Sequence, residues 1–91
     1  MGHKTVKFTR AGLSKLPNDK PVVYKILTQN EGNNYTGVAQ RGRVRDRALD
    51  HLGKIPGAKV RVEQMGSIGE AREKEARIIR RSQPKYNKRG K

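Results

Sequence analysis

The chain has 91 residues, of which 32 % are hydrophobic, and no cysteine, so we expect one domain with a small core and exclude disulfides and cysteine-ligated zinc. Lysine and arginine number 22 against 8 acidic residues, a formal net charge of +14, which attracts polyanions and makes nucleic acid the expected partner. No apolar run approaches the ~20 residues of a membrane span and no N-terminal signal pattern is present, so we expect a cytoplasmic location and no membrane partner.

The first 20 residues are predicted to form an N-terminal extension with a short strand or a helical turn. Val6 and Phe8 alternate with polar residues, which favours a short edge strand over 5–9. Residues 11–16 are compatible with a single helical turn, because the proline that follows them ends a helix.

Two strands joined by a tight turn are predicted next. Residues 21–28 are rich in Val, Ile and Leu, and residues 34–39 form the returning strand. Between them, Glu31-Gly32-Asn33 has the composition of a hairpin turn.

The second half of the chain predicts a helix over 43–52, a strand over 59–65 and a helix over 68–82. The last helix carries a capping box, because Ser67 stands three residues before Glu70. The order of these elements predicts an α+β fold with a small sheet of about three strands and helices packed on it.

Tyr24 and Tyr35 occupy matching ends of the predicted hairpin, eleven residues apart, in a chain with only three tyrosines and one phenylalanine. Taken alone, the pair is explained by amphipathic core aromatics with a solvated hydroxyl. Other residues in the chain favour a chemical role instead.

Glu75 lies within the apolar stripe of the last predicted helix, four residues after Ala71 and three before Ile78. The stripe also includes Ile79 and Ser82, so the Glu75 carboxylate is expected to lean toward the sheet. A carboxylate removed from water needs a counter-charge or a metal ion. The periodicity leaves two readings open, an ion pair with one of the many arginines or a functional ligand.

Arg47 and His51 are four residues apart and share one face of the predicted helix over 43–52. A guanidinium beside a titratable ring suits a phosphodiester site. The remaining basic side chains near this helix and near the C-terminus are expected to attract the nucleic-acid backbone; they are Arg41, Arg43, Arg45, Lys85, Lys88 and Arg89.

Residues 21–87 resemble the GIY-YIG nuclease family. Val22-Val23-Tyr24 and Tyr35-Thr36-Gly37 resemble its two tripeptides, and the Arg47 and His51 pair resembles its Arg-x-x-x-His element. Its terminal elements are matched by a glutamate, a proline and an asparagine, here Glu75, Pro84 and Asn87.

The resemblance implies a three-stranded antiparallel sheet flanked by helices, a nuclease domain over 21–87 and a basic tail over 88–91. It also implies a catalytic set consisting of Tyr24, Tyr35, Arg47, His51, Glu75 and Asn87. There are departures from the family pattern: Val22 stands in place of the usual glycine and Thr36 in place of the usual isoleucine, both at backbone or packing positions. Arg45 is the alternative to Arg47 if the register of the helix differs.

The roles follow from the same resemblance. Glu75 would hold one Mg²⁺ or Mn²⁺ ion, and Arg47 would neutralise charge on the phosphorane. Tyr24 would deprotonate water, alone or through Tyr35, with a pKa lowered by nearby cations. His51 would accept the proton from Tyr24. Asn87 would anchor the C-terminal segment or touch the phosphate.

The expected function is therefore a metal-dependent endonuclease that acts on nucleic acid, with DNA favoured over RNA. Its intrinsic sequence specificity is expected to be low, or to be supplied by a targeting protein partner. One alternative is a non-catalytic basic nucleic-acid-binding protein, either an inactive relative of the family or an RNA binder. Another is a structural or assembly protein, for example a ribosome-associated one. The sequence leaves the oligomeric state open.

Overall fold

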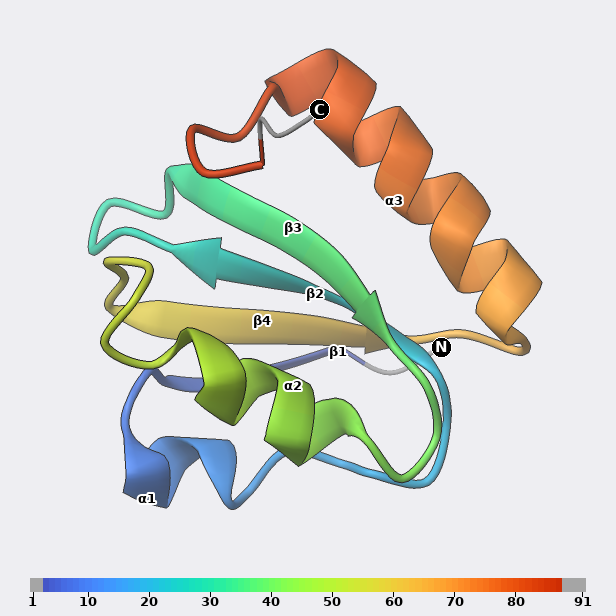
Figure 1. Ribbon diagram of the computed structural model, residues 1–91, viewed down its shortest axis with the longest axis horizontal. Helices are drawn as coiled ribbons and strands as arrows, with labels where there is room; N and C mark the ends of the chain where they lie inside the picture. The colour runs from blue at the N-terminus through green and yellow to red at the C-terminus, as the bar shows by residue number, and fades with distance from the viewer. Residues whose placement is uncertain (1–2, 88–91) are drawn as a thin grey trace.

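A computed structural model describes residues 3–87 of the chain (Figure 1); the predicted tail over 88–91, with Lys88 and Arg89, lies outside these residues. Within the described part, no helix has both the length and the hydropathy that crossing a membrane requires. In chain order the elements are β1 His3–Lys7, α1 Arg10–Leu13, β2 Val22–Leu27, β3 Asn33–Ala39, α2 Val44–His51, β4 Lys59–Gln64 and α3 Ile68–Ser82. The predicted α+β class is confirmed.

The sheet has four antiparallel strands in the order β1-β4-β2-β3. The sequence predicted three, and the difference is β1, which pairs with β4 so that Val6 lies opposite Val60. Burial of Val6 and of Phe8, just beyond the strand, explains why this segment joins the sheet. The predicted edge strand over 5–9 is therefore present but begins two residues earlier.

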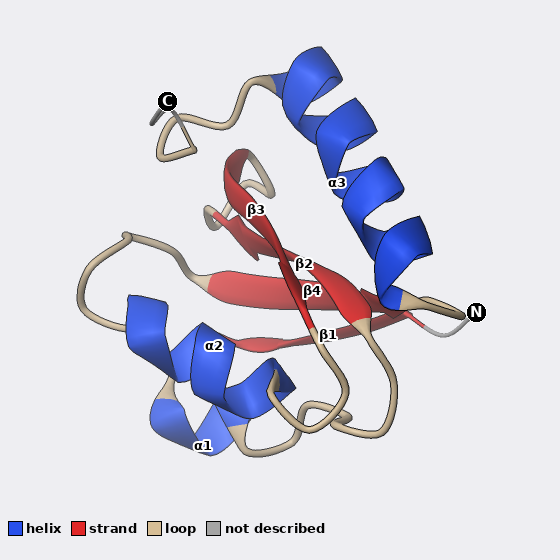
Figure 2. Ribbon diagram, turned by 45° about the vertical axis from the view of Figure 1, so that its right-hand side comes forward, coloured by secondary structure: helices blue, strands red, loops and turns tan. Residues whose placement is uncertain are grey.

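The two faces of the sheet are covered by different helices (Figure 2). Helices α1 and α2 lie against one face and α3 lies against the other. Because side chains alternate along a strand, Tyr24 and Ile26 of β2 point to the α2 face, whereas Val23 and Lys25 point to the α3 face.

The main hydrophobic core lies on the α2 face and the smaller one on the α3 face. The main cluster joins residues from β1, α1, all three other strands and α2, with Leu13, Leu16 and Ile26 fully buried. The smaller cluster has only Val23, Ala71 and Ile78 as buried members, with Val38, Met65 and Ile68 packed at its margin. Burial on the α2 face therefore contributes most of the hydrophobic stabilisation.

Helix α2 is positioned from outside its own segment. Its first residues receive no side-chain cap from Arg43. Instead, the Val44 N–H donates to Asn18 Oδ1 at 2.8 Å and the Gly42 N–H donates to the Asn18 carbonyl at 2.8 Å. Arg45 Nε donates to the Leu16 carbonyl at 2.9 Å. The loop after α1 thus fixes the start of the helix that carries His51.

Helix α3 begins at the predicted cap. The Glu70 N–H donates to Ser67 Oγ at 3.2 Å, while Glu70 Oε1 accepts from the Gly66 N–H at 3.1 Å. The reciprocal bond of the predicted capping box therefore shifts by one residue, to Gly66. Along the predicted stripe Ala71 and Ile78 are buried, but Ser82 is exposed and does not belong to it.

Candidate active site

Gly37 allows the Tyr24 ring to cross the neighbouring strand. The two residues are paired between β2 and β3. A Cβ atom at position 37 would lie 2.7 Å from Tyr24 Oη and 3.0 Å from Tyr35 Cε2, closer than side-chain atoms can approach. The missing side chain is therefore what brings the two phenols together.

Tyr24, Tyr35 and His51 form one cluster of rings. Tyr24 Oη lies 2.9 Å from His51 Nε2. The Tyr35 ring lies against the same imidazole, with centroids 4.5 Å apart and planes at 51°, and the two phenol rings are 6.0 Å apart. The β2–β3 hairpin and α2 thus bring together three of the predicted catalytic residues.

Tyr24 stays protonated at neutral pH. Burial is the largest cause and raises its pKa well above 10, the neighbouring Tyr35 adds to the rise, and Arg47 acts in the opposite direction. The prediction that nearby cations lower the pKa of Tyr24 is therefore wrong in its net direction, because desolvation of the phenolate outweighs the guanidinium.

His51 is held neutral. Burial is the main cause that lowers its pKa below 6.5, Lys54 and Arg47 lower it further, and Asp50 partly opposes them. Tyr24 Oη and His51 Nε2 share one hydrogen bond, and in the tautomer that carries the imidazole proton on Nδ1 the Tyr24 Oη–H donates to His51 Nε2.

Glu75 is half-buried on α3 and forms no ion pair or side-chain hydrogen bond with any residue between positions 3 and 87. Burial raises the pKa of its carboxyl, and the charge of Arg72 only partly opposes that effect. The Glu75 charge also acts to raise the pKa of Tyr24. Of the two readings that periodicity left open, the ion pair is not formed with any of these residues, and the functional ligand stays a prediction.

The carboxylate of Glu75 is an oxygen donor of the kind that Mg²⁺ and Mn²⁺ prefer. No three His, Cys, Asp or Glu side chains gather into a metal-binding group in the part of the chain that the structure describes. Magnesium keeps several of its waters and binds through one or two carboxylates together with substrate phosphate. A lone, partly desolvated carboxylate is compatible with that mode of binding.

The two candidate arginines of α2 lie on different sides of the helix. Arg45 is bonded to the Leu16 carbonyl beside α1, whereas the charge of Arg47 acts on the pKa values of both Tyr24 and His51. Arg47 is exposed, so its guanidinium is accessible to a substrate. Arg47 therefore lies on the side of α2 that affects the ring cluster, and its selection over Arg45 as the catalytic arginine stays a prediction.

Asn87 anchors the C-terminal segment to the open edge of β3. The Thr36 N–H donates to Asn87 Oδ1 at 2.6 Å, and Asn87 Nδ2 donates to the Thr36 carbonyl at 2.8 Å. The amide of Asn87 is therefore occupied by the backbone. Thr36 is itself fully buried, and its Oγ1 accepts from Asn33 Nδ2 at 2.7 Å. The resemblance assigns Thr36 to a backbone or packing position, and no spacing pattern in the sequence predicts these contacts.

The predicted backbone-binding residues that the structure describes lie on the surface. Arg41 is exposed, Arg43 forms an exposed ion pair with Asp46 at 3.8 Å, and Lys85 lies 5.7 Å from the centre of the Tyr86 ring. These side chains remain accessible to a polyanion.

No protein-family model matches the chain, and no curated protein matches it either.

Proposed function

We propose that this protein is a metal-dependent endonuclease that hydrolyses phosphodiester bonds, with DNA as its favoured substrate. The observation that carries the proposal is the 2.9 Å contact between Tyr24 Oη and His51 Nε2, with Tyr35 packed on the same imidazole. A protonated phenol bonded to a neutral imidazole is a ready proton-transfer pair. The resemblance of residues 21–87 to GIY-YIG nucleases supports the same assignment.

Tyr24 acts as a relay in this proposal, because its raised pKa makes a free phenolate unfavourable at neutral pH. As water attacks phosphorus, the water proton passes to Tyr24 Oη and the phenolic proton passes to His51 Nε2. Tyr24 is neutral before and after the transfer, and His51 becomes imidazolium. Tyr35 holds the imidazole in orientation through ring contact.

Arg47 and Glu75 complete the site from α2 and α3. The guanidinium of Arg47 stabilises the negative charge that develops on the phosphorane oxygens. Glu75 is the residue that would hold Mg²⁺ or Mn²⁺, and such an ion supplies charge neutralisation at the phosphate and at the leaving oxygen. Asn87 is a positioning residue, since it holds β3 and the C-terminal segment together.

A nicking assay on supercoiled plasmid, with Mg²⁺ and with chelator, tests the proposal. We expect Mg²⁺-dependent nicking, which Glu75→Gln reduces by at least about 100-fold because the metal ligand is lost. Glu73→Gln is the matched control, since Glu73 is an exposed carboxylate on the same helix, and it should nick as the wild type does. Undiminished nicking by Glu75→Gln would remove the metal assignment.

The competing candidate is a non-catalytic nucleic-acid-binding protein, which the formal net charge of +14 also supports. One experiment distinguishes the endonuclease from the binding protein: DNA binding and nicking are measured for the wild type and for Glu75→Gln. If Glu75→Gln and the wild type bind duplex DNA equally and neither nicks it with Mg²⁺ or Mn²⁺, the chain is a binder. Under the proposal, binding is equal and only the wild type nicks.

A further inference from the structure

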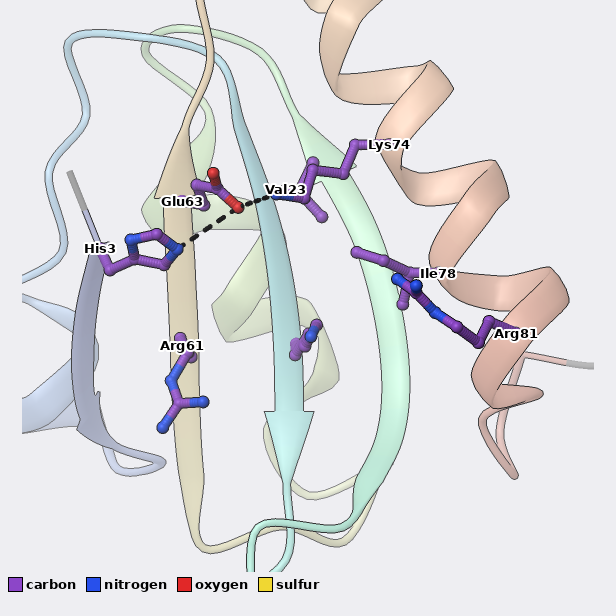
Figure 3. A pocket seen from close by; sticks show the side chains of 8 residues that line it. His3, Val23, Arg61, Glu63, Lys74, Ile78 and Arg81 are labelled. Carbon is purple, nitrogen blue, oxygen red and sulfur yellow. Dashed lines mark hydrogen bonds and ion pairs between the residues drawn. The ribbon is translucent and has the colours of Figure 1, made fainter. Parts of the chain in front are cut away.

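A second polar site lies on the face of the sheet opposite the Tyr24 cluster. It is a pocket of about 260 Å³ between the sheet and α3 (Figure 3). Lys25, Arg61 and Glu63 reach it from the strands, and Lys74 and Arg81 reach it from the helix. In Figure 3 Lys74 extends from α3 toward Glu63 on β4. The strand register places this pocket on the α3 side, away from Tyr24.

The pocket contains more positive charge than its own residues neutralise. Glu63 is the acidic side chain in its wall and already accepts from Lys74 Nζ, with His3 Nε2 3.5 Å from the same carboxylate. Arg61 is bonded to Glu31 at 3.3 Å and to Thr5 Oγ1 at 3.1 Å. The four cations lining the pocket therefore face a single carboxylate within it.

Lys25 and Arg81 have no compensating partner: neither forms an ion pair or a side-chain hydrogen bond with another residue between positions 3 and 87. Lys25 is also half-buried at the sheet surface. Burial is the first cause that lowers its pKa, the charges of Arg61 and Lys74 lower it further, and the charge of Glu63 only partly opposes them. A desolvated ammonium among other cations is an unfavourable arrangement that a bound anion would relieve.

We propose that this pocket binds a phosphate group, either inorganic phosphate or the terminal phosphate of a nucleic-acid strand. The guanidinium of Arg81 favours a tetrahedral oxyanion, to which it donates paired hydrogen bonds. Arg61 adds positive charge from β4, although its guanidinium is already bonded to Thr5 and Glu31. Lys25 supplies a point charge at the floor, and Lys74 and Arg81 supply donors from the helix. The excess positive charge favours a dianion over a monoanion. This site does not depend on nuclease activity, because none of its residues belongs to the Tyr24 cluster.

Thermal unfolding in chelator tests the pocket without any catalysis. Adding inorganic phosphate at constant ionic strength, with chloride as the balancing salt, should raise the Tm of the wild type more than chloride does. Lys25→Met should raise the Tm in chloride, since it removes a desolvated charge, and should abolish the response to phosphate. An equal phosphate response in Lys25→Met and the wild type would overturn the proposal.

A second variant keeps the test valid if Lys25→Met does not fold. Arg81→Gln alters an exposed side chain of α3 and should weaken phosphate binding, measured by calorimetry, by about tenfold, as expected for one lost charge-assisted hydrogen bond. Arg80→Gln is the matched control, because Arg80 is exposed on the same helix and does not line the pocket. If both variants weaken binding equally, the affinity comes from general surface charge and the pocket is not the site.

The source of the phosphate is identified with two single strands of one sequence, one with a 5′-phosphate and one with a 5′-hydroxyl, followed by amide chemical shifts in chelator. Selective shifts at Lys25 and Arg61 with the phosphorylated strand identify a nucleic-acid end as the ligand. Shifts with inorganic phosphate alone identify the free anion. If neither the phosphorylated strand nor inorganic phosphate shifts the amides of Lys25 and Arg61, the pocket is not a phosphate site.

Discussion

The two faces of the sheet handle polar groups in opposite ways. On the α2 face, Tyr24 and His51 are both neutral and satisfy each other inside a cluster of rings. On the α3 face charged groups line the pocket, and among the described residues neither Lys25 nor Arg81 forms an ion pair or a side-chain hydrogen bond. A neutral pair is held by burial and packing, whereas an uncompensated charge under α3 favours binding of an ion.

Glu75 lies on one side of the sheet and affects a residue on the other. It projects from α3, the helix that covers the charged pocket, yet its carboxylate acts on the pKa of Tyr24, on the other side of the sheet. β3 is the edge strand on this side of the sheet, and Gly37 in it leaves room for the Tyr24 ring. Under the proposed function, residues from both faces contribute to one site at this edge.

Removing the Tyr24 hydroxyl breaks the neutral pair and should have the largest effect. Tyr24→Phe is expected to reduce nicking by about 100- to 1000-fold, because the proton relay to His51 is lost. The fold should lose only about 1 kcal/mol, the net value of one hydrogen bond. Plasmid nicking and urea unfolding measure the two effects. Tyr86→Phe, at an exposed tyrosine, is the control, and a Tyr24→Phe enzyme with normal nicking would exclude the relay.

The unequal size of the two cores can be measured by making the same truncation on each face. Ile26 is fully buried in the main cluster, and Ile78 is 4 % exposed in the small one. We expect Ile26→Ala to reduce the free energy of unfolding by about 4 kcal/mol and Ile78→Ala by about 2 kcal/mol, since fewer neighbours surround the second cavity. Urea unfolding of both variants measures the difference. Equal losses would mean that α3 is packed as firmly as α2.

The elements that sequence predicted well are those with a strong local signal. The capped helix α3 and the β2–β3 hairpin were located to within one or two residues, because capping and alternation act over a few neighbouring positions. The sequence predicts the strand β1 but not its place in the sheet, since its partner β4 lies more than 50 residues away. Local patterns do not specify such long-range pairing.

Within the candidate site, periodicity located residues better than it predicted their chemistry. The spacing of Arg47, His51 and Glu75 predicted which faces they occupy. The predicted direction of the Tyr24 pKa shift is wrong, because the depth at which Tyr24 is buried depends on the packing of the whole α2 face. The asparagine clamp on Thr36 and the cationic pocket at Lys25 likewise depend on contacts between distant segments.

Adding one methyl group at Gly37 should disturb the neutral pair without removing any of its members. In Gly37→Ala, the new Cβ would meet Tyr24 Oη and Cζ at 2.7 and 2.8 Å, and both belong to a buried ring held by its surroundings. We expect a loss of about 1–3 kcal/mol in the free energy of unfolding, as for other overpacked cores. The Tyr24–His51 contact should also lengthen, which histidine ring NMR would detect. Unchanged stability and spectra would mean that the ring moves freely.

Surface charges near His51 shift its pKa, and removing one of them should have the smallest effect of the changes described. Charged neighbours act on its pKa in both directions, since Asp50 raises it and Lys54 and Arg47 lower it, while the phenols Tyr24 and Tyr35 face it from the sheet. Nicking should decline as pH falls through the His51 pKa, below 6.5, because imidazolium cannot accept the Tyr24 proton. His51 also contributes stability that is fully present above its unfolded pKa of about 6.5 and is lost as pH falls toward its lower folded value.

Asp50→Asn should move the acidic limb of the nicking profile to lower pH and Lys54→Gln should move it to higher pH, each by a few tenths of a unit, because both charges are exposed and screened. If the acidic limb moves in the same direction in Asp50→Asn and in Lys54→Gln, a group other than His51 controls the pH profile.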